Sequence, residues 1–255
     1  MPPFASYPSL SGRTVFVSGG GSGIGASIVE HFAAQGARVG FVDIDEASST
    51  ALVESIQAAG HPAPLFVSCD IRDVRAYQSA IEGVAGKLGA ITVLVNNAAR
   101  DDRHTIDQVT PDFWDERIAV NLRHAYFAIQ TVAPGMKKAG GGSVVNFSSV
   151  SYHTMTPNLS VYQAAKAAVI GMTRGLARDL GGDGIRLNAV TPGWIMTQRQ
   201  LDLWVTPEAK AAQLGAQCLK ELLYAPDIAR MVLWLASDDS RLVTAQDFVV
   251  DGGRV

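Results

Sequence analysis

The chain has 255 residues, of which 47% are hydrophobic and 18% are charged, and its formal net charge is −3. This composition is typical of a globular protein with a large core, and the length suits one α/β domain. The small net charge, with lysines and arginines scattered along the chain, disfavours nucleic acid as a partner.

The spacing of cysteines, histidines and hydrophobic residues excludes further classes. Cys69 and Cys218 lie far apart without a CxxC spacing, so we expect two reduced thiols rather than a disulfide framework or a zinc site. The five histidines form no HxxxH or HExxH pattern, and we expect no metal. No hydrophobic run approaches membrane-spanning length, and residues 1–4 lack the features of a signal peptide. These observations favour a cytoplasmic protein with no membrane partner.

Short β-branched or hydrophobic runs alternate with longer segments of helical periodicity along the whole chain. This alternation predicts an α/β fold, a Rossmann-type doubly wound parallel sheet of about seven strands with helices on both faces. The predicted helices include residues 24–35, 114–138 and 161–180. The predicted strands cover residues 14–18, 37–43, 64–69, 91–96, 143–148, 185–190 and 247–250.

No internal repeat, low-complexity tract or linker divides the sequence. Residues 1–255 are therefore predicted to form a single domain. The most irregular stretch, residues 191–223, is rich in Trp, Gln and Pro, and we interpret it as a mobile lid over a substrate.

A glycine-rich segment, residues 18–25, follows the first predicted strand and opens the first long helix. Glycines permit a tight turn and a close approach of backbone to phosphate, and the helix N-terminus offers free N–H groups. A plain flexible turn is the alternative, but the strand–turn–helix context favours a dinucleotide site. The expected cofactor contacts in this segment are Gly19, Gly21, Ser22, Gly23, Ile24 and Gly25.

Asp43 ends the second predicted strand, eighteen residues after Gly25. A carboxylate at this place accepts hydrogen bonds from the adenosine ribose hydroxyls and repels a 2′-phosphate. No Lys or Arg in the glycine-rich segment or directly after Asp43 would neutralise that phosphate. The sequence therefore predicts NAD rather than NADP, with Asp43 as the cap of a helix starting near Glu46 as the alternative.

Tyr162 and Lys166 are four residues apart in the helix predicted over residues 161–180, so both side chains lie on one face. A nearby ammonium favours the ionised form of a phenol, so we expect Lys166 to lower the pKa of Tyr162. Such a tyrosine can take a proton from an alcohol or donate one to a carbonyl. A solvated surface lysine is the alternative for Lys166.

In this combination and order the motifs resemble the short-chain dehydrogenase/reductase family over nearly the full length. Ser149 lies thirteen residues before Tyr162, which is the family's usual interval, and 251–253 match its C-terminal DGG. The chain departs from the family pattern at Ser18, at Ala99 in place of a glycine, and at 244–246. The resemblance implies a catalytic set of Asn121, Ser149, Tyr162 and Lys166.

The resemblance assigns a role to each of these four residues. Tyr162, as phenolate, takes the proton from the substrate hydroxyl, and Ser149 holds the reacting oxygen. Lys166 also holds the nicotinamide ribose, and Asn121 maintains a local backbone irregularity and a water. Hydride passes to the nicotinamide. Further implied contacts with the cofactor are Ile44, Asp70, Ile71, Asn97, Ala98, Ala99, Tyr162, Lys166, Pro192, Gly193, Ile195 and Thr197.

A narrower resemblance, to the NAD-dependent D-xylose 1-dehydrogenases and related aldose dehydrogenases, covers residues 101–104, 114–118, 121–124 and 132–138 and continues at 217–220 and 235–239. It implies oxidation of the anomeric carbon of a sugar to a lactone. Polar side chains of the strand-end loops are the expected substrate contacts, with loop stabilisation as the alternative for Asp101 and His104 and lid packing for Trp194. The expected set is Arg100, Asp101, His104, Ser149, Ser151, His153, Tyr162 and Trp194.

Two other functions stay open at this point. Arg100, Arg103 and Arg199 favour a 2-keto-3-deoxy sugar acid, and L-arabinose, L-fucose or a secondary alcohol are further substrates to consider. A non-catalytic NAD-binding sensor or scaffold is the other class, against which the intact catalytic set argues. The helices predicted over 114–138 and 161–180 are apolar on more than one face, so we expect a homotetramer, with Trp114 and Arg117 as structural residues on a helix that packs against a neighbouring subunit.

Overall fold

The computed structural model describes residues 5–255, and residues 1–4, considered above for a signal peptide, lie outside the described residues. Within the described residues seven strands form one sheet in the order β3-β2-β1-β4-β5-β6-β7, and every pairing is parallel. The predicted doubly wound parallel sheet is confirmed. The strands are β1 (Thr14–Ser18), β2 (Arg38–Asp43), β3 (Leu65–Ser68), β4 (Val93–Asn96), β5 (Gly142–Phe147), β6 (Ile185–Pro192) and β7 (Asp247–Val250).

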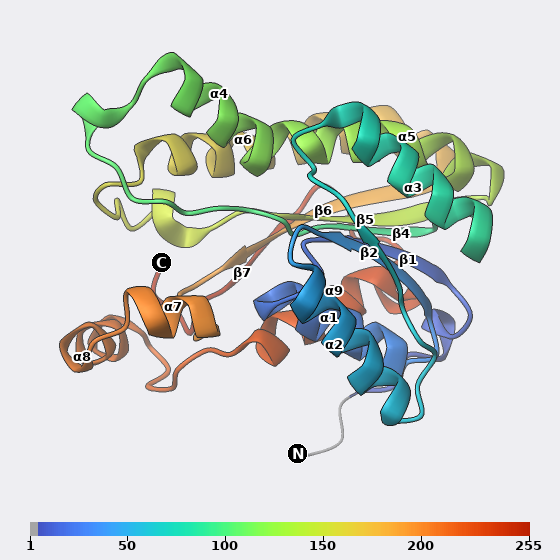
Figure 1. Ribbon diagram of the computed structural model, residues 1–255, viewed down its shortest axis with the longest axis horizontal. Coiled ribbons are helices and arrows are strands. Elements are labelled where there is room, and N and C mark those ends of the chain that lie inside the picture. Colours follow the sequence, from blue (N-terminus) through green and yellow to red (C-terminus); the bar gives the residue numbers. More distant parts are fainter. Residues whose placement is uncertain (1–4) are drawn as a thin grey trace.

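The central strand β1 is buried on both faces, which requires a helical layer on each side of the sheet. Val15 and Val17 belong to one hydrophobic core cluster, and Phe16 between them belongs to a second. Helices α1, α2 and α9 cover one face, and α3, α5 and α6 cover the other (Figure 1). Their bounds are α1 (Gly23–Ala34), α2 (Glu46–Ala58), α3 (Val74–Leu88), α5 (His124–Lys138), α6 (Ser160–Leu180) and α9 (Ala225–Ala236).

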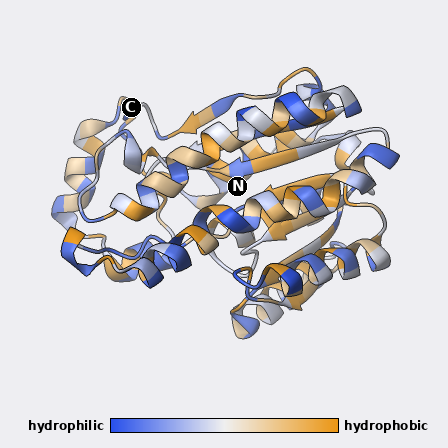
Figure 2. Ribbon diagram, turned by 90° about the horizontal axis from the view of Figure 1, so that it is seen from above, coloured by the Kyte–Doolittle hydropathy of each residue, from blue (hydrophilic) through white to orange (hydrophobic). Residues whose placement is uncertain are grey.

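Hydropathy follows this layered arrangement. Figure 2 shows the strands as largely hydrophobic and the covering helices with hydrophobic and hydrophilic residues interspersed along each of them. Such a pattern places one face of each helix against the sheet and the other toward solvent. None of the helices in residues 5–255 combines the length and the hydropathy needed to cross a membrane.

The segment predicted as one helix over residues 114–138 has a break in its hydrogen-bonding pattern. The Thr110 hydroxyl caps the N-terminus of helix α4 (Pro111–Ile118). A π-helical turn over Ala119–Arg123 separates α4 from α5. Such π-helical turns occur frequently at functional sites. The turn contains Asn121, whose predicted role is to maintain a backbone irregularity.

The predicted lid, residues 191–223, contains more regular structure than the sequence analysis expected. Helix α7 (Gln198–Leu203) is capped by Thr197, and helix α8 (Pro207–Ala216) is capped by Thr206 and has a proline in its first turn. Both lie together on one side of the molecule, away from the helices that cover the sheet (Figure 1). The irregular lid is therefore a pair of short capped helices.

Candidate active site

The glycine-rich segment leaves β1 and turns directly into α1. The amide of Gly19 donates to the carbonyl of Val42 over 2.8 Å, and the Asn97 side chain donates to the carbonyl of Gly19 over 2.9 Å. A methyl group on Gly25 would lie 1.8 Å from the Gly19 carbonyl oxygen, so only glycine fits here. Within the described residues the Ser22 side chain does not cap α1, which leaves its first amides available to a phosphate.

Asp43 is held at the end of β2 by three backbone amides. Its carboxylate accepts from Gly21 and Ile44 over 2.8 Å each and from Asp45 over 3.0 Å. The alternative that Asp43 caps the next helix is wrong, because Asp45 is the residue that caps α2. Asp43 instead lines the cleft described next.

A cleft of about 890 Å³ runs along the carboxyl ends of the strands and brings most of the predicted site together. All predicted cofactor residues except Gly21 line it, and Gly21 lies behind Asp43, to which it donates. Six of the predicted substrate residues also line it, namely Arg100, Asp101, Ser149, Ser151, Tyr162 and Trp194.

The two predicted histidines do not line this cleft. His104 is buried, and its ring Nε2 contacts the Ser160 hydroxyl at 3.2 Å and the Val161 amide at 3.3 Å. It therefore fastens the loop after β4 to the start of α6, which is the structural alternative considered for it. His153 is exposed and stacks on Tyr152 with ring centroids 4.0 Å apart. Both substrate assignments are corrected.

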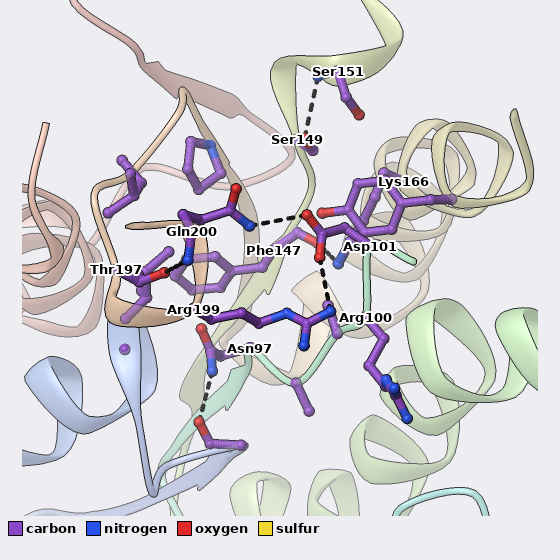
Figure 3. Close-up of a pocket in the computed structure, with 18 of the residues that line it drawn as sticks. Asn97, Arg100, Asp101, Phe147, Ser149, Ser151, Lys166, Thr197, Arg199 and Gln200 are labelled. Carbon is purple, nitrogen blue, oxygen red and sulfur yellow. Dashed lines mark hydrogen bonds and ion pairs between the residues drawn. The ribbon is translucent and has the colours of Figure 1, made fainter. Parts of the chain in front are cut away.

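Tyr162 and Lys166 both line the cleft from α6. Ser149 reaches the cleft from the segment after β5, and Figure 3 shows Lys166 and Ser149 there. The Lys166 ammonium nitrogen lies 5.6 Å from the centre of the Tyr162 ring and donates to the Phe147 carbonyl over 2.8 Å. Lys166 is only 2% exposed, so the alternative of a solvated surface lysine is wrong.

The protonation of this pair differs from the prediction. Burial raises the pKa of the Tyr162 phenol, and the nearby Asp101 carboxylate raises it further, against the lowering effect of a Ser149 hydrogen bond. Burial also lowers the pKa of Lys166 to about 7. The expected lowering of the Tyr162 pKa by Lys166 is absent from the described structure, because removal of the phenol from water outweighs the lowering effects of Ser149 and Arg103.

The buried lysine makes stability depend on pH. Between a folded pKa of about 7 and the ordinary value of 10.5, the unfolded chain binds more protons than the native protein. The free energy of unfolding therefore rises with pH in this window, by at most about 1.4 kcal/mol per unit. We expect the stability of the wild type relative to Lys166→Met to increase between pH 7.5 and 9.5, as measured by urea unfolding.

The control for this measurement is Lys138→Met, which alters an exposed lysine near the end of α5. The difference in the free energy of unfolding between Lys138→Met and the wild type should stay constant with pH. A constant difference for Lys166→Met as well would contradict a neutral buried lysine.

Asn121 joins the π-helical turn to the loop after β4. Its side chain accepts from the Arg100 amide over 2.9 Å and donates to the Arg100 carbonyl over 3.1 Å and to the Arg117 carbonyl over 3.0 Å. These are backbone partners, so the structure supports a role in holding this loop. Its predicted part in catalysis stays a prediction.

A network of charged side chains beside this site was not predicted from the sequence. Arg117, expected to be structural at a subunit contact, is 4% exposed, and its guanidinium pairs with Asp102 and Glu116 inside this chain. Glu116 in turn contacts Arg72 at 2.6 Å. Charge alternation along α4 was the available signal, but the partner on the loop after β4 is distant in sequence.

The lid contributes two further side chains: Gln200, which was not predicted, and Arg199, which was considered only as a contact for a sugar acid. Gln200 donates to the Asp101 carboxylate over 3.0 Å and accepts from the Trp194 indole over 2.8 Å. Arg199 lies 3.1 Å from Asp102 and 3.6 Å from Asp101. The threonine cap three residues before Gln200 was the signal that these residues lie on one helix turn.

The cleft therefore combines a helix N-terminus open to phosphate, an acid placed for a ribose and a tyrosine–lysine–serine set. These features, on a doubly wound parallel sheet, define a nucleotide-dependent dehydrogenase. Comparison with known proteins agrees, since a family model described as enoyl-(acyl carrier protein) reductase matches residues 19–254. The chain belongs to the short-chain dehydrogenase/reductase family and is an NAD(P)-dependent oxidoreductase.

Individual relatives cover nearly the whole chain. It is 51% identical to the probable galactose dehydrogenase GalD of Rhizobium meliloti, over 98% of each sequence. It is 49% identical to D-xylose 1-dehydrogenase of Caulobacter vibrioides, also over 98% of each. The crystal structure of a 3-oxoacyl-[acyl-carrier protein] reductase with bound NAD from Brucella melitensis superposes with a TM-score of 0.88 at 33% identity, covering 97% of this chain and 92% of that one. The resemblance to the family is confirmed.

Proposed function

We propose that this protein is an NAD-dependent sugar dehydrogenase that oxidises the anomeric hydroxyl of an aldose such as D-xylose to the lactone. The observation that carries the proposal is the full-length similarity, at 49% and 51% identity, to two proteins named as sugar dehydrogenases. The cleft supports it, because its wall carries the charged and hydroxyl side chains that a polyol requires.

In the proposed reaction Tyr162 acts as phenolate: its oxygen takes the proton of the anomeric hydroxyl and becomes a neutral phenol, while the Ser149 hydroxyl holds the same substrate oxygen. When bound, NAD supplies the hydride acceptor and a positively charged ring, whose charge favours the phenolate. Lys166 would hold the nicotinamide ribose. Asn121 keeps the loop after β4 in place through both of its bonds to the Arg100 backbone.

NAD, rather than NADP, is the proposed cofactor because Asp43 would face a 2′-phosphate with a negative charge. We expect Asp43→Ala to lower the ratio of kcat/KM for NAD over NADP by at least about a hundredfold, equal to 2–3 kcal/mol, since it removes ribose hydrogen bonds and charge repulsion together. Steady-state kinetics with both cofactors measures this ratio. Asp45→Ala, which removes the cap of α2, is the control and should leave the ratio unchanged. A wild-type preference for NADP would contradict the assignment.

The proposed substrate contacts are the six residues that line the cleft. Ser151 is the clearest example, because its hydroxyl is buried at the cleft and has no hydrogen-bond partner within residues 5–255. A buried hydroxyl of this kind gains a partner when a polyol binds. Arg100, Asp101, Ser149, Tyr162 and Trp194 complete the proposed set.

The arginines that favoured a sugar acid line the cleft, but each of them contacts another side chain of this protein. Arg100 and Arg199 lie 3.3 Å and 3.1 Å from Asp102, and Arg103 lies over the Trp204 ring at 5.1 Å. This pairing reduces the positive charge available to a carboxylate substrate. A neutral aldose is therefore favoured over a sugar acid.

The test is the absorbance of NADH after mixing the purified protein with NAD and a panel of substrates. The panel contains D-xylose, D-galactose, L-arabinose, L-fucose, a 2-keto-3-deoxy sugar acid and secondary alcohols. We expect the highest kcat/KM with a neutral aldose. Higher kcat/KM with a sugar acid or an alcohol would replace the proposed substrate, and no turnover of any compound would favour a sensor or scaffold.

We further propose a cytoplasmic homotetramer. Trp114 and Tyr126, on α4 and α5, are 45% and 46% exposed and present a hydrophobic surface that a second subunit would cover. Light scattering of the purified protein tests this assembly, and a monomer would contradict it.

A further inference from the structure

A hydrogen-bonded bridge joins the lid to the loop after β4 across the mouth of the cleft. We call it the lid bridge and define it as Trp194, Gln200, Arg199 and Asp101. The Trp194 indole donates to Oε1 of the Gln200 side chain over 2.8 Å, and Nε2 of the same side chain donates to Asp101 Oδ2 over 3.0 Å. Arg199 lies 3.6 Å from Asp101 Oδ1 (Figure 3).

The chemistry of its neighbours fixes the orientation of the Gln200 amide. An indole N–H can only donate, and an ionised carboxylate can only accept. Gln200 can therefore satisfy Trp194 and Asp101 together in one orientation, with oxygen toward the indole and nitrogen toward the carboxylate. A side chain locked at both ends transmits the position of the lid to Asp101.

The start of α7 lies beside the glycine-rich segment. Thr197 caps α7 through the Gln200 amide, and its methyl group would lie 3.3 Å from a β-carbon on Gly23. Thr197 also lines the cleft beside the glycine-rich segment. Gln200 is thus one helical turn away from the cofactor site and in direct contact with the substrate loop.

Asp101 keeps acceptor capacity that the lid bridge does not use. A carboxylate offers about four lone-pair sites, and the bridge occupies one with a hydrogen bond while Arg199 approaches the other oxygen. The Asp101 side chain lines the same cleft as Tyr162. A sugar whose reacting carbon lies at Tyr162 would therefore place its other hydroxyls in the same cleft as this carboxylate.

We propose that Gln200 is a positioning residue for substrate selectivity: it orients Asp101 to accept a hydrogen bond from the hydroxyl on the carbon next to the reacting carbon. The inference rests on the proposed sugar dehydrogenase function and adds a specific recognition contact to it. The lid thereby selects a 2-hydroxylated aldose over its 2-deoxy analogue, because the analogue has no hydroxyl to donate to the acceptor sites that Gln200 and Arg199 leave free on Asp101.

The test compares kcat/KM for the best aldose and for its 2-deoxy analogue in the wild type and in Gln200→Ala. We expect a wild-type ratio of at least about a hundred, and a ratio at least about tenfold smaller in Gln200→Ala, mainly through a higher KM for the aldose. The Kd for NAD, measured by calorimetry, should stay within about twofold, because within residues 5–255 the Gln200 side chain bonds to Trp194 and Asp101 and not to the glycine-rich segment.

Leu201→Ala is the matched control. Leu201 is the next residue of the same helix, but its side chain is 38% exposed and is not among the residues that line the cleft. This variant should keep the wild-type ratio and KM. Gln200→Glu is the second test variant, since it cannot donate to Asp101 and places a second carboxylate beside it. It should reduce the ratio at least as far as Gln200→Ala.

The outcomes separate this inference from the function on which it rests. Thermal unfolding establishes that both Gln200 variants are folded. If the wild type oxidises aldoses and both folded variants keep the wild-type ratio, the lid bridge plays no part in selectivity and the inference is wrong. If the wild type oxidises no aldose, the proposed function is wrong, and the inference is overturned with it. A reduced ratio in Leu201→Ala equal to that in Gln200→Ala would also overturn it, since it would reflect general loosening of α7.

Discussion

Replacing Tyr162 by phenylalanine should lower kcat by at least about a thousandfold while the Kd for NAD changes by less than about twofold. The substitution removes one oxygen and leaves the ring in place on α6. That oxygen is the group that accepts the substrate proton, and the nearby Ser149 hydroxyl cannot replace it. Because the ring still covers Lys166, the shape of the cofactor cleft is retained.

The measurement combines NADH formation at saturating sugar with calorimetric titration of NAD. Tyr152→Phe is a suitable control. Tyr152 lies after β5, as Tyr162 does, but it is not among the residues that line the cleft. Its kcat should stay near the wild-type value. Near-normal turnover by Tyr162→Phe would show that another group takes the proton. NAD binding without turnover in both the wild type and Tyr162→Phe would favour a sensor.

Gly25→Ala should weaken NAD binding by at least about a hundredfold and lower the melting temperature. The added methyl group would lie 1.8 Å from the Gly19 carbonyl oxygen and 2.7 Å from the Asn97 amide nitrogen. Contacts this short force the backbone of the glycine-rich segment away from the start of α1. The phosphate site is made of that backbone, so binding is lost together with the packing.

The matched control is Gly171→Ala in the middle of α6, where an added methyl group meets no atom within 4 Å. It should leave NAD binding unchanged and raise stability by up to about 1 kcal/mol, because alanine favours the helix. Calorimetric titration and thermal unfolding measure both effects. Retention of wild-type NAD affinity by Gly25→Ala would contradict the close packing of this loop.

The sheet and the cofactor loop were predictable because their signals are local. The hydrophobic runs that form β1 and β5 are buried whichever helices cover them, so their positions follow from the sequence itself. The glycine-rich segment, Asp43 and the pair of Tyr162 and Lys166 depend on spacing within one element or one connection. Asp43, Tyr162, Lys166 and five residues of the glycine-rich segment line the cleft.

The rest depended on contacts between distant segments. His104 and Ser160 are 56 residues apart, and Gln200 and Asp101 are 99 apart, so nothing in the local sequence indicates either pairing. For the same reason His104 was wrongly assigned to the substrate, and Gln200 was missed. The prediction for the pKa of Tyr162 failed for a different reason. Helix spacing gives the distance to Lys166, but it does not show how much water both groups lose on burial.

The strand order also bears on how the chain reaches its native state. Every pairing in the described sheet is parallel, so each one requires a crossover connection and a contact that is not local. Chains dominated by such contacts fold slowly. The cleft uses Gly19 after β1, Asn97 after β4 and Ser149 after β5, three neighbouring strands that come from different parts of the sequence. Recognition of the dinucleotide is therefore a late event in folding, available only after the central strands have assembled.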